Sequence, residues 1–130
     1  MNLSDLVSHY IDVVAILLFG IGFSLLLFNK NLIKKIMGMN IMDTGIYLFL
    51  ASMGYIDGKM APVFNGSSTN PVDYINPIPA GLVLTGIVVS VSVTSITLAL
   101  TVRLYKRYKT LDLDEVYSIV YSEHDEKEVK

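Results

Sequence analysis

The stretch "YINPIPAGLVLTGIVVSVSVTSITLALTV", residues 74–102, contains no Lys, Arg, Asp or Glu. A second uncharged stretch, "VVAILLFGIGFSLLLFN", covers residues 13–29. A helix crosses the hydrocarbon core of a bilayer with about 17 to 25 predominantly apolar residues. Both stretches are long enough to do so, and a soluble domain of this size would not need them. The sequence therefore predicts a membrane protein.

The remaining composition excludes several classes of site. The chain has no Cys, which excludes disulfides, thiolate metal sites and Cys nucleophiles. With His9 and His124 as its only His residues, it offers no His cluster, and we expect no metal and no cofactor. The net charge is -2, and the cations lie beside apolar runs, so we expect no nucleic-acid partner.

Three spans are predicted, at about residues 11–28, 36–55 and 78–102. Backbone groups inside lipid must be satisfied within the segment, so each span should be a helix. We therefore expect an all-α fold, with residues 1–130 forming a single three-helix, multi-pass membrane subunit.

The distribution of Lys and Arg predicts the orientation. Residues 1–11 carry neither, and the loop at 56–77 carries only Lys59. Cytoplasmic segments carry an excess of these cations. We therefore expect the N-terminus outside and the C-terminus in the cytoplasm, because the cations gather in two other segments: Lys30, Lys34, Lys35, Arg103, Lys106, Arg107 and Lys109.

A short amphipathic helix is predicted at about residues 110–123, with Thr110 as its candidate cap. Its acidic residues would be repelled by anionic lipid headgroups, so docking on a partner protein is the better interpretation. We expect "HDEKEVK", residues 124–130, to be a mobile, solvated tail. The apolar face has helical spacing, and its first three members are the candidate docking residues: Leu113, Val116, Tyr117, Val120 and Tyr121.

Small and hydroxyl-bearing residues align on one side of the third span. Such faces allow close approach of membrane helices, although an ion or water path is an alternative. Gly20 and Ser24 form a shorter face of the same kind in the first span. The third-span face consists of Gly86, Ser90, Thr94, Thr97 and Thr101.

The second span carries a more polar face, formed by Asn40, Asp43, Thr44 and Tyr47. Intramembrane carboxylates face a bundle interior or a water-filled cavity, which makes Asp43, with Asn40 and Thr44, a candidate for an ion path. The alternative is that Asp43 is a buried acceptor for a partner's Lys, Arg or hydroxyl group. We also expect that three helices cannot hide two polar faces by packing only on themselves, which predicts a larger assembly.

The resemblance to a known family is carried by "NLIKKIMGMNIMDTGIYLFL" (31–50), "NPIPAGLVLTGIVVSVSVTSITLAL" (76–100) and "RLYKRYKTLDLDEV" (103–116). Together they resemble the C subunit of Mrp-type multisubunit Na+/H+ antiporters. That protein is similar to NuoK, the small three-helix subunit of respiratory complex I. The same subunit type occurs in membrane-bound hydrogenase and sulfane-reductase type complexes. In the complex I relative, the positions of Asn40 and Val93 carry Glu.

The resemblance implies a small subunit of a Na+/H+ translocation module in a prokaryotic cell membrane, NuoK-like in fold and not an enzyme by itself. Its partners would be larger antiporter-like subunits and other small membrane subunits, and Na+ and H+ would be the transported ions. The module would be a stand-alone antiporter or part of a ferredoxin-linked hydrogenase or sulfur-reducing respiratory complex. A holin-like pore or a small homo-oligomeric transporter is the alternative.

Overall fold

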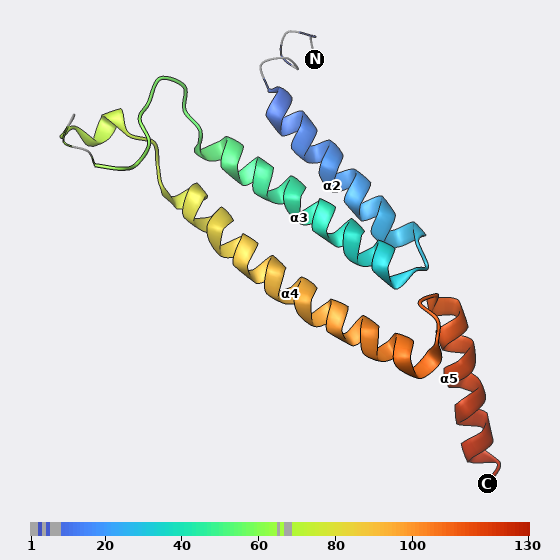
Figure 1. Ribbon diagram of the computed structural model, residues 1–130. Coiled ribbons are helices and arrows are strands. Elements are labelled where there is room, and N and C mark those ends of the chain that lie inside the picture. The colour runs from blue at the N-terminus through green and yellow to red at the C-terminus, as the bar shows by residue number, and fades with distance from the viewer. Residues whose placement is uncertain (1–2, 4, 6–8, 65, 67–68) are drawn as a thin grey trace.

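The structure is a computed structural model that describes residues 3, 5, 9–64, 66 and 69–130. Three long helices lie side by side: α2 (Tyr10–Phe28), α3 (Leu32–Gly54) and α4 (Ile78–Tyr108). The central helix is α3, which packs against both α2 and α4 (Figure 1). Each of the three is long and apolar enough to cross a membrane. The predicted all-α fold with three spans is confirmed.

A short turn at residues 29–31 reverses the chain between α2 and α3. The Asn31 side chain caps α3 by accepting a hydrogen bond from the Ile33 backbone N–H at 3.0 Å. An Asn in this position satisfies a backbone donor that the first turn of a helix leaves unpaired. The helix therefore begins four residues before the predicted span, because its capped first turn lies ahead of the apolar segment.

Small residues bring the backbones of α2 and α3 into direct contact. A Cβ added to Gly22 would lie 2.6 Å from the Gly38 carbonyl oxygen, and one added to Gly45 would lie 2.8 Å from the Ala15 carbonyl oxygen. Ala15 is only 1% exposed. Small residues at such contacts are how membrane helices approach closely.

The face predicted for the first span is not the one that packs within the chain. Gly20 and Ser24 are exposed, and a Cβ on Gly20 would meet nothing within 4 Å. The contact is made instead by Gly22 and Ala15, which are seven residues apart and therefore lie on the same side of the helix.

The connection between α3 and α4 lies at the far end from the 29–31 turn (Figure 1). It includes the short 3-10 helix η1 (Pro71–Asp73), whose N-cap Asn70 accepts a hydrogen bond from the Val72 backbone N–H at 3.3 Å. Backbone hydrogen bonds between Met60 and Asp73 and between Ile75 and Met60 close the connection on itself.

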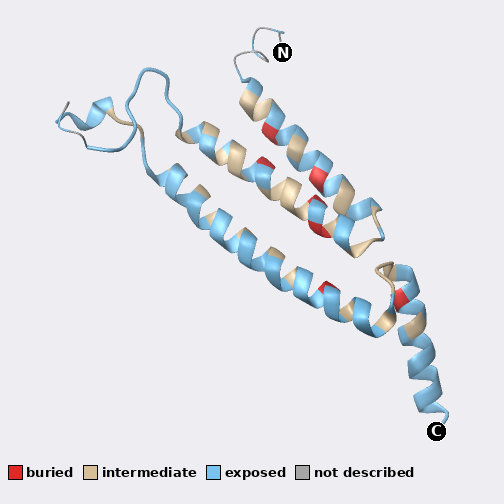
Figure 2. Ribbon diagram, viewed as in Figure 1, coloured by how far each residue is buried: buried red, intermediate tan, exposed pale blue. Residues whose placement is uncertain are grey.

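The last membrane helix, α4, continues to Tyr108, beyond the predicted end at 102. Its final turns contain Lys and Arg, which are good helix formers, so the helix outlasts the apolar segment. It ends at Lys109, which has a left-handed backbone with φ 58°. Thr101 is the one buried residue of α4, and the rest of the helix is largely exposed (Figure 2). A single row of helices thus leaves a wide face of α4 uncovered.

The C-terminal helix α5 (Leu113–Glu128) is longer and begins later than predicted. Asp112, and not Thr110, is its N-cap, with its carboxylate accepting a hydrogen bond from the Asp114 backbone N–H at 2.9 Å. Thr110 instead accepts a hydrogen bond from the Asp112 backbone N–H in the preceding turn. The helix also continues past its predicted end at about residue 123: residues 124–128 are exposed but helical, because Glu and Lys propagate the helix.

The start of α5 is tied to the α2–α3 turn. The Leu32 backbone N–H donates to the Leu111 carbonyl, and the Leu113 backbone N–H donates to the Lys30 carbonyl, each at 3.1 Å. An exposed ion pair joins Lys30 to Asp114. The hydrogen bond and charge of Asp114 raise the pKa of Lys30 above its ordinary value of 10.5. These contacts fix where α5 leaves the helix row.

Candidate functional site

The polar faces of α3 and α4 meet each other along the length of the contact. The Tyr47 hydroxyl donates to the Gly86 carbonyl at 2.7 Å, and a Cβ on Gly86 would lie 2.6 Å from Cε1 of Tyr47. About two helical turns away, the Thr94 hydroxyl donates to the Asn40 side-chain oxygen at 2.8 Å. The two helices run antiparallel, so positions rise along α3 as they fall along α4.

Asp43 lies between these two contacts. Its Oδ2 accepts a hydrogen bond from the Ser90 hydroxyl at 2.8 Å, across the helix interface. Both side chains are half-buried. Among the described residues, Ser90 is the one hydrogen-bond partner of the carboxylate, which leaves Oδ1 available to another group.

An open groove of about 610 Å³ runs along this polar contact. It is large enough for several water molecules, each of which occupies about 30 Å³ in the liquid. Its walls combine oxygen-bearing side chains with aliphatic ones: Asn40, Asp43, Thr44, Tyr47, Leu48, Ile87, Ser90, Val91, Thr94 and Ser95. Carboxylate, amide and hydroxyl oxygens can form hydrogen bonds with water and can coordinate hard cations.

The two polar faces meet each other but are only partly hidden, because Asp43 and Ser90 stay half-buried and Thr44 is exposed beside the open groove. Asn40, Asp43 and Tyr47 on α3 pair with Thr94, Ser90 and Gly86 on α4. Among the described residues, no buried side-chain nitrogen or oxygen lacks a hydrogen-bond partner. The sequence could not show this, because helical periodicity fixes the face of each helix but not which helix it meets.

The other candidate residues have local roles in the structure. Thr44 is exposed on the groove wall and donates to the Asn40 carbonyl of its own helix at 2.8 Å. Thr97 donates to the Val93 carbonyl at 2.8 Å, and Thr101 donates to the Thr97 carbonyl. Neither of these two threonines reaches α3 through its hydroxyl group.

A second carboxylate in the helix row was not predicted from the sequence. The Ser52 hydroxyl of α3 donates to Oδ1 of Asp12 in the first turn of α2, at 2.5 Å. This pair closes one end of the tightly packed α2–α3 interface and does not line the groove. The sequence did not identify Ser52 as a partner of Asp12, because a single Ser near a helix end is common in membrane helices.

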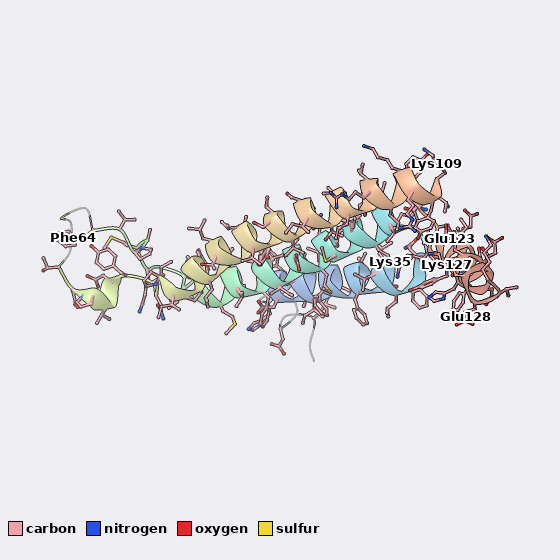
Figure 3. All side chains as sticks on the ribbon, turned by 90° about the horizontal axis from the view of Figure 1, so that it is seen from below. Lys35, Phe64, Lys109, Glu123, Lys127 and Glu128 are labelled. Carbon is pink, nitrogen blue, oxygen red and sulfur yellow. The ribbon has the colours of Figure 1, made fainter. Side chains whose placement is uncertain are left out.

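The candidate docking residues of α5 differ in how far the chain itself covers them. Val116 is buried and Leu113 is half-buried within the chain, whereas Tyr117 is exposed. Val116 is thus already used by the chain itself. The charged groups labelled in Figure 3, which include Lys35, Lys109 and Glu123, gather at this end of the molecule, and Phe64 lies at the opposite end.

Comparison with known proteins gives one family. The family model described as NADH-ubiquinone/plastoquinone oxidoreductase chain 4L matches residues 10–119. The C subunit of the Na+/H+ antiporter of Alkalihalophilus pseudofirmus is 35% identical over 105 residues, which are 81% of this chain and 90% of that protein. Its counterpart in the Na+/H+ antiporter of Bacillus subtilis is 34% identical over 91 residues, which are 70% of this chain and 78% of that protein.

A solved structure shares the three-helix arrangement. One chain of the membrane-bound sulfane sulfur reductase, an archaeal respiratory membrane complex, superposes with a TM-score of 0.71 at 42% identity. The match covers 78% of this chain and 91% of that one. The fold and the sequence are therefore both similar to those of membrane subunits in larger complexes.

Proposed function

Since this chain belongs to the NADH-ubiquinone/plastoquinone oxidoreductase chain 4L family, we propose that it is a non-catalytic subunit of an ion-translocating complex and lends Asp43 to a hydrophilic path. It is a multi-pass membrane protein whose relatives include the C subunits of Na+/H+ antiporters. This similarity supports a role as a subunit over a holin-like pore or a homo-oligomeric transporter.

The observation that carries the proposal is the position of Asp43 on the wall of an open groove. A carboxylate facing lipid near the bilayer centre costs roughly 2.5–3.5 kcal/mol on insertion scales, and one buried in protein or beside water avoids that cost. Ser90 satisfies only one of its oxygens among the described residues. A neighbouring membrane subunit would therefore cover the groove and keep water inside it.

A hydrated groove gives Asp43 two chemical abilities. Its carboxylate can take up and release a proton through water, and its free oxygen can serve as a ligand for a partly dehydrated cation. Asn40 and Thr44 add oxygens on the same side of α3. H+ and Na+ are accordingly the proposed transported ions, and larger antiporter-like subunits are the proposed partners.

We propose further that the chain belongs to a respiratory membrane complex and not to a stand-alone antiporter. Its identity to the chain of the sulfane sulfur reductase is 42%, compared with 35% to the antiporter protein of Alkalihalophilus pseudofirmus. In such a complex the redox reaction would take place in other subunits, and this chain would belong to the part that moves ions.

The proposed orientation follows from the charges at the two ends of the row. Cations near the 29–31 turn and after residue 102 support a cytoplasmic location for that end, including α5. A reporter fused after Lys130 should then be cytoplasmic, and an external signal from that fusion would reverse the orientation.

The test is cation-dependent proton flux in vesicles that contain the complete complex, normalised to the amount of assembled protein. Asp43→Asn keeps the size and the hydrogen-bond acceptor but removes the titratable charge, so we expect a complex that assembles and has lost coupled flux. Asp43→Glu should retain most of the flux. Asp12→Asn is the matched control, because Asp12 pairs with Ser52 outside the groove, and we expect normal flux.

Two outcomes would contradict the proposal. Normal flux in Asp43→Asn would make Asp43 a structural acceptor for Ser90. Loss of assembly would show that Asp43 pairs with a charge in a partner subunit, because removing one member of a buried pair leaves the other unpaired in a low-dielectric site.

A further inference from the structure

The outer side of α5 carries an apolar face that the chain itself does not cover. Tyr117 is 61% exposed, Val120 36% and Tyr121 71%, and we call these three residues the tyrosine face. Their spacing places them on one side of the helix. Val116 lies one turn before Val120 on the same face, but it is only 8% exposed because the chain itself covers it. The tyrosine face is therefore free for an external contact.

The helix that carries this face is weakly supported by its own chain. It leaves the row of membrane helices at an angle and projects from the end of the molecule (Figure 1). An isolated helix of about 12–15 residues is marginal in water, and most helices are stabilised by packing of an amphipathic face. The family match ends at residue 119, within α5. The distal half of α5 therefore lies beyond the part that the family model describes.

The charge of α5 restricts what can cover it. One Lys stands against six carboxylates in this helix: Asp114, Glu115, Glu123, Asp125, Glu126 and Glu128. Asp114 pairs with Lys30, and Glu123 pairs with Arg107 at 3.5 Å. In the described part of the chain, no ion pair engages the acidic end formed by Asp125, Glu126 and Glu128.

These charges disfavour two possible binding partners of α5. The surface of an anionic membrane repels carboxylates, so α5 does not lie on lipid headgroups. A second copy of α5 would bring like charges together, which is unfavourable across an interface. An occupant of opposite charge gains from both the acidic end and the tyrosine face.

We propose that the tyrosine face and the acidic end of α5 dock onto a cationic, water-exposed protein surface of a different subunit of the complex. Lys or Arg side chains of that surface lie against the faces of Tyr117 and Tyr121, where cation–π contact is favourable. Further cations meet Asp125, Glu126 and Glu128, which sets the orientation of the contact. Tyr and Arg are both enriched in such interfaces.

The proposal rests on the proposed function of the chain as a subunit of a complex, but its test measures contact between subunits and not transport. A benzophenone amino acid replaces Tyr121 in the complete purified complex, and irradiated products are identified by peptide mass spectrometry. We expect a covalent adduct with another protein subunit, at a segment that contains Lys or Arg. The same probe in place of Tyr55, which is 67% exposed at the opposite end of the row, is the control and should not give this adduct.

A charge-reversal variant sharpens the test. Asp125→Lys combined with Glu126→Lys and Glu128→Lys should abolish the adduct from position 121 while the adducts from position 55 stay unchanged. An adduct with lipid alone, an adduct with a second copy of this chain, no protein adduct, or an adduct insensitive to charge reversal would each overturn the proposal. Loss of flux in Asp43→Asn with an intact adduct would support both proposals separately.

Discussion

The two helix interfaces of this protein are built from different groups. Between α2 and α3, the backbones touch at Gly22, Gly38 and Gly45, and a Cβ on any of them would overlap neighbouring atoms. Between α3 and α4, hydrogen bonds from Tyr47 and to Asp43 make the contact beside an open groove. One interface is filled by its own backbone, and the other keeps space beside polar groups.

This difference separates a scaffold from a candidate path. Lipid supplies no hydrophobic force between helices, so shape and hydrogen bonds determine which helices associate. A contact between two backbones has a single arrangement and fixes α2 on α3. A contact made by side-chain hydrogen bonds can exchange partners with water or an ion and remain polar. The α3–α4 interface is therefore the one to which we assign the proposed ion path.

Gly22→Ala should have the largest effect, because it breaks the interface in which the two backbones touch. The added Cβ would lie 2.6 Å from the Gly38 carbonyl oxygen, and rigid backbone cannot yield easily. We expect a loss of about 1–3 kcal/mol in the free energy of unfolding, as for other overpacked cores. Thermal unfolding of the purified complex measures this effect. Gly20→Ala is the control, since its Cβ meets nothing within 4 Å, and equal losses in both variants would refute the packing account.

Gly86→Ala should have a smaller effect, although the overlap has a similar distance. Its Cβ would lie 2.6 Å from Cε1 of Tyr47, which is at the far end of a side chain that can rotate away. The cost is then mainly the Tyr47–Gly86 hydrogen bond, about 0.6–1.7 kcal/mol for a bond between membrane helices. The same unfolding measurement ranks the two variants. A greater loss for Gly86→Ala than for Gly22→Ala would reverse the assignment of rigid and adaptable interfaces.

The pH dependence of the α5 junction should be the smallest effect. Asp114 raises the pKa of Lys30 from its ordinary value of 10.5, so their pairing stabilises the junction at and below that pH. The stabilisation is lost as the pH rises through the raised pKa and Lys30 loses its charge. We expect weaker protection from hydrogen exchange, relative to the intrinsic rate at the same pH, in the first turns of α5 above about pH 10.5. Lys30→Gln should remove this pH-dependent difference, and its persistence in that variant would assign it to other groups.

The sequence predicted the three spans because a bilayer requires uncharged runs of this length and a soluble domain does not. It also predicted the polar faces of α3 and α4, since the polar residues within each span recur at helical spacing. Asp43 belongs to the face on α3 and Ser90 to the face on α4. The sequence failed on the pairing of these faces and on the choice of Gly22 over Gly20, because both depend on how far each helix is rotated toward its neighbour. The hydrogen bond from Ser52 to Asp12 could not be predicted for the same reason. Contacts between helices are thus the part that periodicity alone does not determine.

The central claim, that the α3–α4 groove holds water and the α2–α3 interface does not, can be tested directly because the chain has no Cys. Thr44→Cys places a thiol on the groove wall, and Ile46→Cys places one in the apolar depression between α2 and α3. A charged, membrane-impermeant thiol reagent is applied to the complete complex in vesicles, and modification of this chain is followed by mass. The thiolate is the reactive form and needs a polar environment, so position 44 should react about tenfold or more faster than position 46. Equal rates at the two positions, or an unreactive Thr44→Cys, would contradict the account.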